Sequence, residues 1–171
     1  MTDETDRQDF TALVRRHDSR LRAVAYKLLG GDRARMDDVM QDAYLRAFRS
    51  YADFRGEAAV NTWLHRIVYN ACIDELRRSR RRPQLHHVDG GEYETASTHA
   101  GPERVVTARD LVMRALATLP PDQRATLLLV DSEGFDHTEV AEILSVAPGT
   151  VASRLSRART HMRRALGEEG R

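Results

Sequence analysis

The sequence predicts an all-α protein built from two small helical domains that a flexible linker joins. Apolar residues recur three and four positions apart over most of the chain, which is the period of an amphipathic helix. No segment shows the strict alternation of a half-buried strand. Only 83–104 lacks a sustained apolar period, so the predicted domains cover 6–82 and 105–166. At 171 residues, the chain leaves each domain a modest core.

The first two predicted helices each carry one apolar stripe. The helix over 6–29 ends at Gly30 and Gly31, which favour a helix stop. Its stripe consists of Phe10, Leu13, Val14, Leu21, Val24, Ala25 and Leu28. The helix over 36–51 buries a second stripe, which consists of Met36, Val39, Met40, Ala43, Tyr44, Ala47, Phe48 and Tyr51. We therefore expect the two helices to pack against a common core.

The opposite side of the 36–51 helix mixes charged residues with one leucine. This outer face carries Asp38, Gln41, Asp42, Leu45, Arg46 and Arg49. On the residue pattern alone, the solvent-exposed side of a core helix is the preferred interpretation, and a docking surface is the alternative.

The third segment, 54–82, combines an apolar stripe with aromatic and basic residues. The stripe consists of Val60, Trp63, Leu64, Ile67, Val68 and Ala71. It leads into a basic cluster that consists of Arg77, Arg78, Arg80, Arg81 and Arg82 and ends at Pro83. Aromatic rings also alternate with Arg and Asn here: Phe54, Arg55, Asn61, Trp63, Arg66, Tyr69 and Asn70. This mixture is typical of a platform for single-stranded nucleic acid. Packing in the core is the preferred interpretation of Trp63. A Trp63 ring with one exposed edge could pack in the core and also stack on a base.

Neither the predicted linker nor the single cysteine indicates a metal or redox site. Three histidines in the linker, His86, His87 and His99, have no Cys or carboxylate at a recognisable ligand spacing, so a solvated linker is favoured. Cys72 is expected to be a small buried residue, and one cysteine excludes an internal disulfide. The pattern thus predicts no cofactor and no metal.

The second domain begins near Val105 with two further predicted helices. The first covers 105–119, and its apolar face consists of Leu111, Val112, Ala115, Leu116 and Leu119. Two prolines, Pro120 and Pro121, then break the chain, and a helix over 122–133 ends at Gly134.

A helix-turn-helix over 135–164 is the most specific pattern in the chain. Asp136 can cap its first helix, with Glu139 three residues later completing a capping box. After a short turn near Ser145, Pro148 stands where a second helix would begin. A core side follows at helical spacing, made of Val151, Leu155, Ala158 and Met162. The outer side carries Thr150, Ala152, Ser153, Arg154, Ser156, Arg157 and Arg159.

The outer side of this second helix suits a DNA major groove. Five arginines and no acid occur from 150 to 164. Arg can bind guanine or phosphate, and Ser and Thr can reach either. An ordinary surface hairpin of two helices is the alternative, but the small Ala141 at the crossing point and the absence of acids favour DNA.

Composition and charge limit which compartment and which classes of partner the sequence predicts. The net charge is only +1, so the total charge does not predict nucleic-acid binding, although acidic and basic residues gather in separate parts of the chain. No apolar run has the length of a membrane span, and no signal peptide is visible. We expect a cytoplasmic protein without direct membrane insertion.

Four motifs in order resemble the bacterial sigma-70 family, specifically the short extracytoplasmic-function (ECF) sigma factors. They are DDVMQDAYLRAF at 37–48, FRGEAAVNTWLHRIVYNACIDELRR at 54–78, LPPDQRATLLLVDSEGF at 119–135 and GTVASRLSRAR at 149–159. The part from 58 to 78 is most similar to actinobacterial members of the sigma-M type. Such proteins contain region 2 and region 4 joined by a linker, so the resemblance implies region 2 over 6–82 and region 4 over 105–166.

The resemblance implies a role for each surface. The helix like 37–49 docks on core RNA polymerase, chiefly on the beta-prime subunit with further contacts to beta, which favours the docking interpretation of Asp38, Gln41, Asp42, Leu45, Arg46 and Arg49. The segment like 54–78 opens and reads the minus-10 element, which implies roles for Phe54, Arg55, Asn61, Trp63, Arg66, Asn70, Arg77 and Arg78. Region 4 reads the minus-35 element, which implies roles for Thr150, Ala152, Ser153, Arg154, Ser156 and Arg157.

The chain departs from the family pattern at the recognition turn. Ser145 and Ala147 stand where relatives often have Gly and a capping residue, and Ala152 stands where Lys or Arg is frequent. A missing cap typically costs about 1 kcal/mol, so the fold should survive, but the minus-35 preference is open.

The resemblance also implies an anti-sigma factor, often one that holds the protein at a membrane, and no enzymatic activity.

Two other functions are alternatives to a sigma factor. An autonomous helix-turn-helix regulator would leave 54–82 without a role and would normally bind as a dimer. A metal-dependent enzyme would use His65, His86, His87 and nearby acids, but the sequence lacks a ligand spacing, a phosphate loop and a nucleophile motif.

Overall fold

The structure is a computed structural model that describes residues 2–52, 54, 59–81 and 106–168. Over this part of the chain the regular elements are helices alone, which confirms the all-α prediction. The predicted linker over 83–104 lies outside the described residues, as do residues 55–58. The domain boundaries therefore stay predictions.

Helices α1, Thr2–Leu28, α2, Arg33–Tyr51, and α3, Val60–Arg81, form the first domain. The predicted stop after α1 is confirmed, because Gly30 and Gly31 adopt φ values of 74° and 87°, which only glycine takes without strain. The Asp32 carboxylate then accepts from the Arg35 N–H and begins α2. Large, fully buried side chains from all three helices fill the core: Leu21, Leu28, Met40, Leu64 and Val68.

One member of the predicted α2 stripe lies outside the core. Phe48 is 39% exposed, although the sequence pattern assigns it to the buried side. Its ring contacts Phe10 of α1 edge-on, with centroids 5.3 Å apart, at the margin of the domain. Helical periodicity assigns the correct side of the helix, but it does not show where the neighbouring helix stops covering that side.

The second domain consists of α4, Ala108–Thr118, α5, Pro121–Leu127, a π-helical turn η1, Leu128–Ser132, α6, His137–Leu144, and α7, Pro148–Glu168. A capping box of Thr107 and Asp110, which was not predicted from the sequence, begins α4. Val112, predicted on the buried face of this helix, is 40% exposed, and the neighbouring Met113 packs against the core instead. The helix predicted over 122–133 corresponds to the α-helix α5 followed directly by the π-helical turn η1.

The predicted helix-turn-helix is confirmed as α6 and α7. Asp136 accepts the N–H groups of Thr138 and Glu139, and the Glu139 carboxylate accepts the Asp136 N–H at 2.9 Å. Ser145 ends α6 in the left-handed conformation, with φ 53°, so the turn forms with serine where glycine would be easier. Buried Val151, along with other apolar residues of α7, faces the core as predicted.

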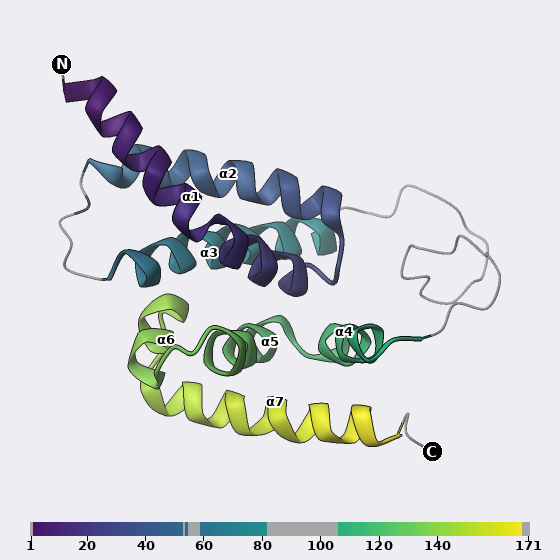
Figure 1. Cartoon of the computed structure of the whole chain (residues 1–171). Coiled ribbons are helices and arrows are strands. Elements are labelled where there is room, and N and C mark those ends of the chain that lie inside the picture. The colour runs from purple at the N-terminus through teal and green to yellow at the C-terminus, as the bar shows by residue number, and fades with distance from the viewer. Residues whose placement is uncertain (1, 53, 55–58, 82–105, 169–171) are drawn as a thin grey trace.

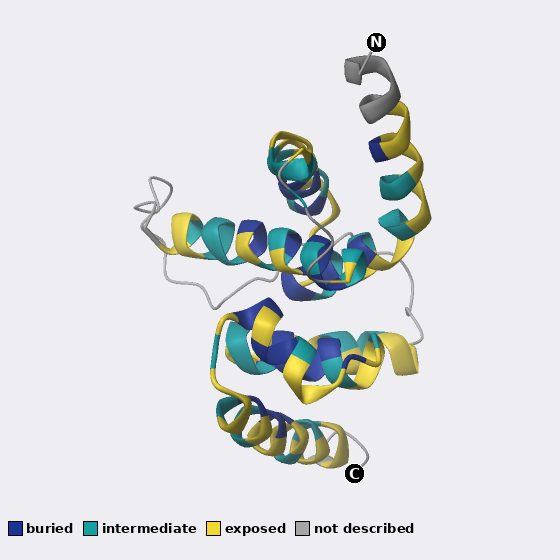
Figure 2. Cartoon of the chain, turned by 90° about the vertical axis from the view of Figure 1, so that its left-hand side faces the viewer, coloured by how far each residue is buried: buried dark blue, intermediate teal, exposed yellow. Residues whose placement is uncertain are grey.

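The two domains pack against each other in layers. In Figure 1 the helices α1–α3 lie above α4–α6, and α7 lies on the far side of the second domain. Helix α3 packs on α6, and α1 contacts α4 and α5. Figure 2, seen from the side, shows the same stacking, with many exposed residues on the outer side of α7.

Candidate functional site

The outer side of α2 is an open strip with an apolar centre. Four of its predicted docking residues are exposed: Asp38, Gln41, Leu45 and Arg49. Leu45 is 57% exposed and Phe48, one helical turn away, is 39% exposed, so two large apolar side chains adjoin on this surface. An apolar pair rimmed by charged residues suits a protein partner better than water.

The remaining two predicted docking residues also have a structural role. The Arg46 guanidinium contacts Asp42 at 2.7 Å and donates to Asp74 of α3 at 2.9 Å. The hydrogen bond to Asp74 raises the pKa of Arg46. Arg46 therefore joins α2 to α3 while remaining half-exposed at one edge of the strip.

Aromatic side chains gather where α2 ends and α3 begins. The Phe54 ring lies 4.7 Å from the Trp63 ring, centroid to centroid, at an angle of 32°. Trp63 also faces Tyr51 at 6.5 Å. Trp63 is half-buried, so it packs against the core and keeps part of its surface free. Arg55, which is predicted to contact the minus-10 element, lies outside the described residues.

The outer face of α3 presents basic and amide groups. Arg66, Asn70 and Arg77 are exposed and follow one another at spacings of four and seven, so they share one side of the helix. Arg78 is also exposed, with its Nε 3.6 Å from the Glu75 carboxylate. Asn61 lies deeper: its side-chain oxygen is buried and has no hydrogen-bond partner within the described part of the chain.

The predicted minus-35 residues of α7 differ in exposure. Ala152, Ser156 and Arg157 are exposed, whereas Thr150, Ser153 and Arg154 are partly buried. The Ser153 hydroxyl already donates to the Thr150 carbonyl at 3.0 Å. Of the two predicted arginines, Arg157 is thus the more exposed, and the Ser153 hydroxyl is already bonded to the helix backbone.

Two carboxylates of the second domain form ion pairs with arginines of α7. Arg154 Nη2 lies 3.1 Å from Asp122 Oδ2, and only 22% of the Arg154 side chain is exposed. Arg159 was predicted on the outer face of α7 but not among the minus-35 residues. It donates two hydrogen bonds to Asp131, at 3.1 and 2.6 Å. These pairings depend on how α5 and η1 sit against α7, which no local pattern indicates.

Other candidate chemistry is limited in the described residues. No group of three or more His, Cys, Asp or Glu side chains is arranged there to hold a metal ion, and the three linker histidines lie outside the part described. Cys72 is buried, and burial raises the pKa of its thiol to about 12. Of the helices described, none is long and apolar enough to cross a membrane.

Two family models match separate parts of the chain. Residues 13–82 match the model of Sigma-70 region 2, and residues 109–162 match that of Sigma-70 region 4. The chain is 43% identical over 162 residues to the ECF RNA polymerase sigma factor SigM of Mycobacterium tuberculosis, across 95% of this chain and 79% of that protein. It is 32% identical over 164 residues to the ECF RNA polymerase sigma-E factor of Escherichia coli, across 90% and 84% of the two chains.

Solved structures share the fold. The sigma factor RpoE of Bartonella quintana, in complex with the anti-sigma factor NepR, matches with a TM-score of 0.73 and 25% identity, across 94% of this chain and 98% of that one. CnrH in complex with the cytosolic domain of CnrY matches with a TM-score of 0.67. The two family models and the sequence relatives show that the chain belongs to the sigma-70 family, as one of its ECF RNA polymerase sigma factors.

Proposed function

We propose that the protein is a promoter-specificity subunit that binds core RNA polymerase, recognises the minus-35 and minus-10 elements, and promotes DNA melting. The observation that carries this proposal is the presence of three separate exposed surfaces on one chain. They are the apolar and charged strip on α2, the aromatic and basic face of α3, and the outer side of α7. An autonomous DNA-binding protein needs only the last of them.

Each surface suits its proposed partner. Leu45, with Phe48 beside it, would anchor the contact with the beta-prime subunit, because exposed apolar side chains in a charged rim gain most from burial. Arg66, Asn70 and Arg77 of α3 would follow the minus-10 strand, while Phe54 and Trp63 supply rings on which an unpaired base stacks. Arg157 would contact the minus-35 element in the major groove.

Melting in this scheme needs no covalent chemistry. Capture of unstacked bases by the aromatic end of α3 offsets the few kcal/mol that unpairing costs. The protein therefore acts by binding rather than as an enzyme. Because the solved relatives carry anti-sigma factors, we also propose such a partner for this chain, which works in the bacterial cytoplasm and is held at the membrane when that partner is anchored there.

The docking assignment is tested with two leucine variants. Leu45→Glu places a charge in the α2 strip and should weaken binding to core polymerase by at least about tenfold, as expected for an apolar anchor. Leu166→Glu is the matched control, because Leu166 is also an exposed leucine, at 39%, but lies near the end of α7. Equal core binding by L45E and the wild type would show that the α2 strip is not the docking surface.

A further inference from the structure

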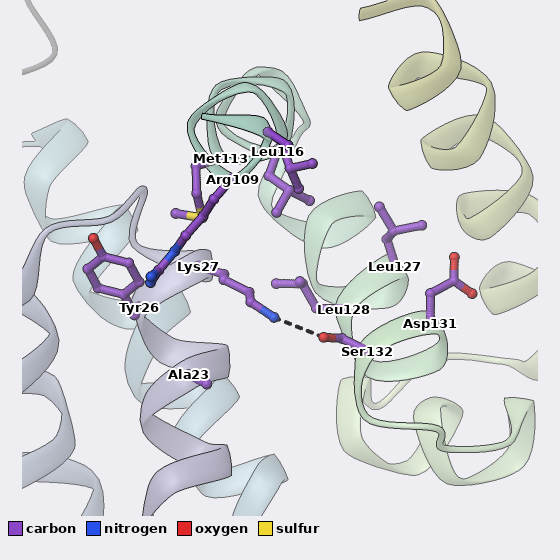
Figure 3. Close-up of a pocket in the computed structure, with 12 residues that line it drawn as sticks. Ala23, Tyr26, Lys27, Arg109, Met113, Leu116, Leu127, Leu128, Asp131 and Ser132 are labelled. Carbon is purple, nitrogen blue, oxygen red and sulfur yellow. Dashed lines mark hydrogen bonds between the residues drawn. The ribbon is translucent and has the colours of Figure 1, made fainter. Parts of the chain in front are cut away.

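A cleft of about 540 Å³ lies between α1 and the α4–η1 side of the second domain. Its lining is mostly apolar: Leu116 and Leu128 are buried there, and Met113 packs against the core. Figure 3 shows Met113 and Leu128 facing this space from two different elements. The described residues that line the cleft include none of those proposed above to contact core polymerase or promoter DNA. The cleft is therefore a feature that the proposed function does not use.

Two cationic side chains reach the cleft from different walls. Lys27 comes from α1 and Arg109 from α4, and Figure 3 shows both extending into the space between these helices. Lys27 Nζ donates to the Ser132 hydroxyl at 2.9 Å, and this partner is neutral. Arg109 is exposed, and within the described part of the chain it forms no hydrogen bond or ion pair. These contacts therefore leave both positive charges without a counter-charge.

The single carboxylate among the described lining residues is already paired. Asp131 accepts two hydrogen bonds from Arg159 of α7, at 3.1 and 2.6 Å. Figure 3 shows the Asp131 carboxylate turned toward the α7 side, away from Lys27. The cleft thus combines an apolar lining with an excess of positive charge. This combination is complementary to a ligand that has an apolar body and an anionic group.

We propose that this cleft binds a small apolar monoanion of the size of a medium-chain fatty acid. Its volume falls within the range of pockets that hold small ligands. The hydrocarbon chain lies against Leu116, Leu128 and Met113, where apolar surface is removed from water. The carboxylate accepts charge-assisted hydrogen bonds from Lys27 and Arg109. A nucleotide fits less well, because its polar base would lie unpaired against an apolar lining.

The test uses the full chain, with decanoate as the probe and decanol as its neutral counterpart. Isothermal titration calorimetry at low ionic strength should show saturable binding of one decanoate per chain. Decanol should bind at least about fivefold more weakly, because it lacks the charge that the two cations attract. Decanoate should also raise the melting temperature, since a ligand that binds only the folded state stabilises it.

Removing each positive charge in turn locates the carboxylate of the ligand. Lys27→Gln and Arg109→Gln should each weaken decanoate binding by up to about fivefold, as expected for one partly exposed ion pair, and the double variant by about tenfold. Decanol binding should stay unchanged, which shows that the apolar lining is intact. Arg114→Gln is the matched control, because Arg114 is also exposed on α4 but does not line the cleft. R114Q should bind decanoate as the wild type does.

Failure of decanoate to bind below the concentration at which it forms micelles would overturn the inference. Equal affinities for decanoate and decanol, or the same loss in R114Q as in R109Q, would show that Lys27 and Arg109 do not recognise the anion. Binding of many molecules without saturation would indicate detergent-like adsorption and would equally contradict a defined site. These measurements involve neither polymerase nor promoter, so their outcome is independent of the proposed function.

Discussion

Replacing Arg157 with alanine should weaken binding of the minus-35 element by about 1–3 kcal/mol, or roughly 5- to 150-fold. Arg157 is exposed on the outer side of α7. Unlike Arg154 and Arg159, it forms none of the ion pairs described above, so its guanidinium can bind a base or phosphate without first breaking one. The loss should fall on promoter binding alone, because α7 lies on the far side of region 4 from the α2 strip.

Arg154→Ala should cost less than Arg157→Ala. In the free protein Arg154 is already paired with Asp122 at 3.1 Å, and it must give up that contact to bind DNA. An ion pair of this kind contributes about 0.2–1 kcal/mol, so the net gain from Arg154 on DNA is smaller by that amount. By the same reasoning, Asp122→Asn should strengthen minus-35 binding by up to about fivefold, and only while Arg154 is present.

The assay is a titration of reconstituted holoenzyme with a fluorescent promoter duplex, with core binding measured in parallel for every variant. D122N, R154A and the double variant form a cycle, which isolates the coupling between the two side chains. An equal loss of core binding in R157A would show that α7 is misassigned. A gain from D122N in the R154A background would refute the competition between Asp122 and DNA for Arg154.

Three further predictions concern stability and reactivity. Asp136→Ala removes the α6 cap and should lower the free energy of unfolding by about 1 kcal/mol, seen as a lower melting temperature, whereas an unchanged value would contradict the cap. Cys72, whose pKa burial raises to about 12, should resist maleimide until the chain unfolds; rapid native labelling would contradict its burial. Burial lowers the pKa of His65 below 6.5, and its hydrogen bond with the Asn61 carbonyl opposes this only in part. The contribution of His65 to stability is therefore complete above pH 6.5 and is lost as the pH falls toward the folded pKa. Urea unfolding at about pH 7.5 and 5.5 should show this loss, and His65→Asn should reduce it, unlike a change at the exposed His137.

Local signals predicted most of the secondary structure. The Asp136 and Glu139 capping box, the Gly30 stop and the Pro148 start each depend on a few neighbouring residues, and the structure has all three. Side-chain burial was less predictable. Phe48 lies on the side of its helix that periodicity assigns to the core, yet it is 39% exposed, because burial also depends on how the neighbouring helices pack around that side.

The domain contact could not be predicted from the sequence. Arg124 lies in a family motif, but its partner in the other domain is the carbonyl of Leu28, a backbone atom that carries no sequence signal. His65 likewise reads as an ordinary α3 residue until Phe135 is placed against it. Periodicity indicates which faces are apolar, but it does not indicate that two domains separated by a linker will share an interface.

The most direct measurement is run-off transcription by purified core RNA polymerase, with and without this protein, on a mixture of promoters from its own genome. The account predicts transcripts from particular promoters only when the protein is present, and it predicts that Leu45→Glu reduces them through loss of core binding. Tight binding of duplex DNA by the protein alone, without core binding or initiation, would contradict the account and favour an autonomous regulator.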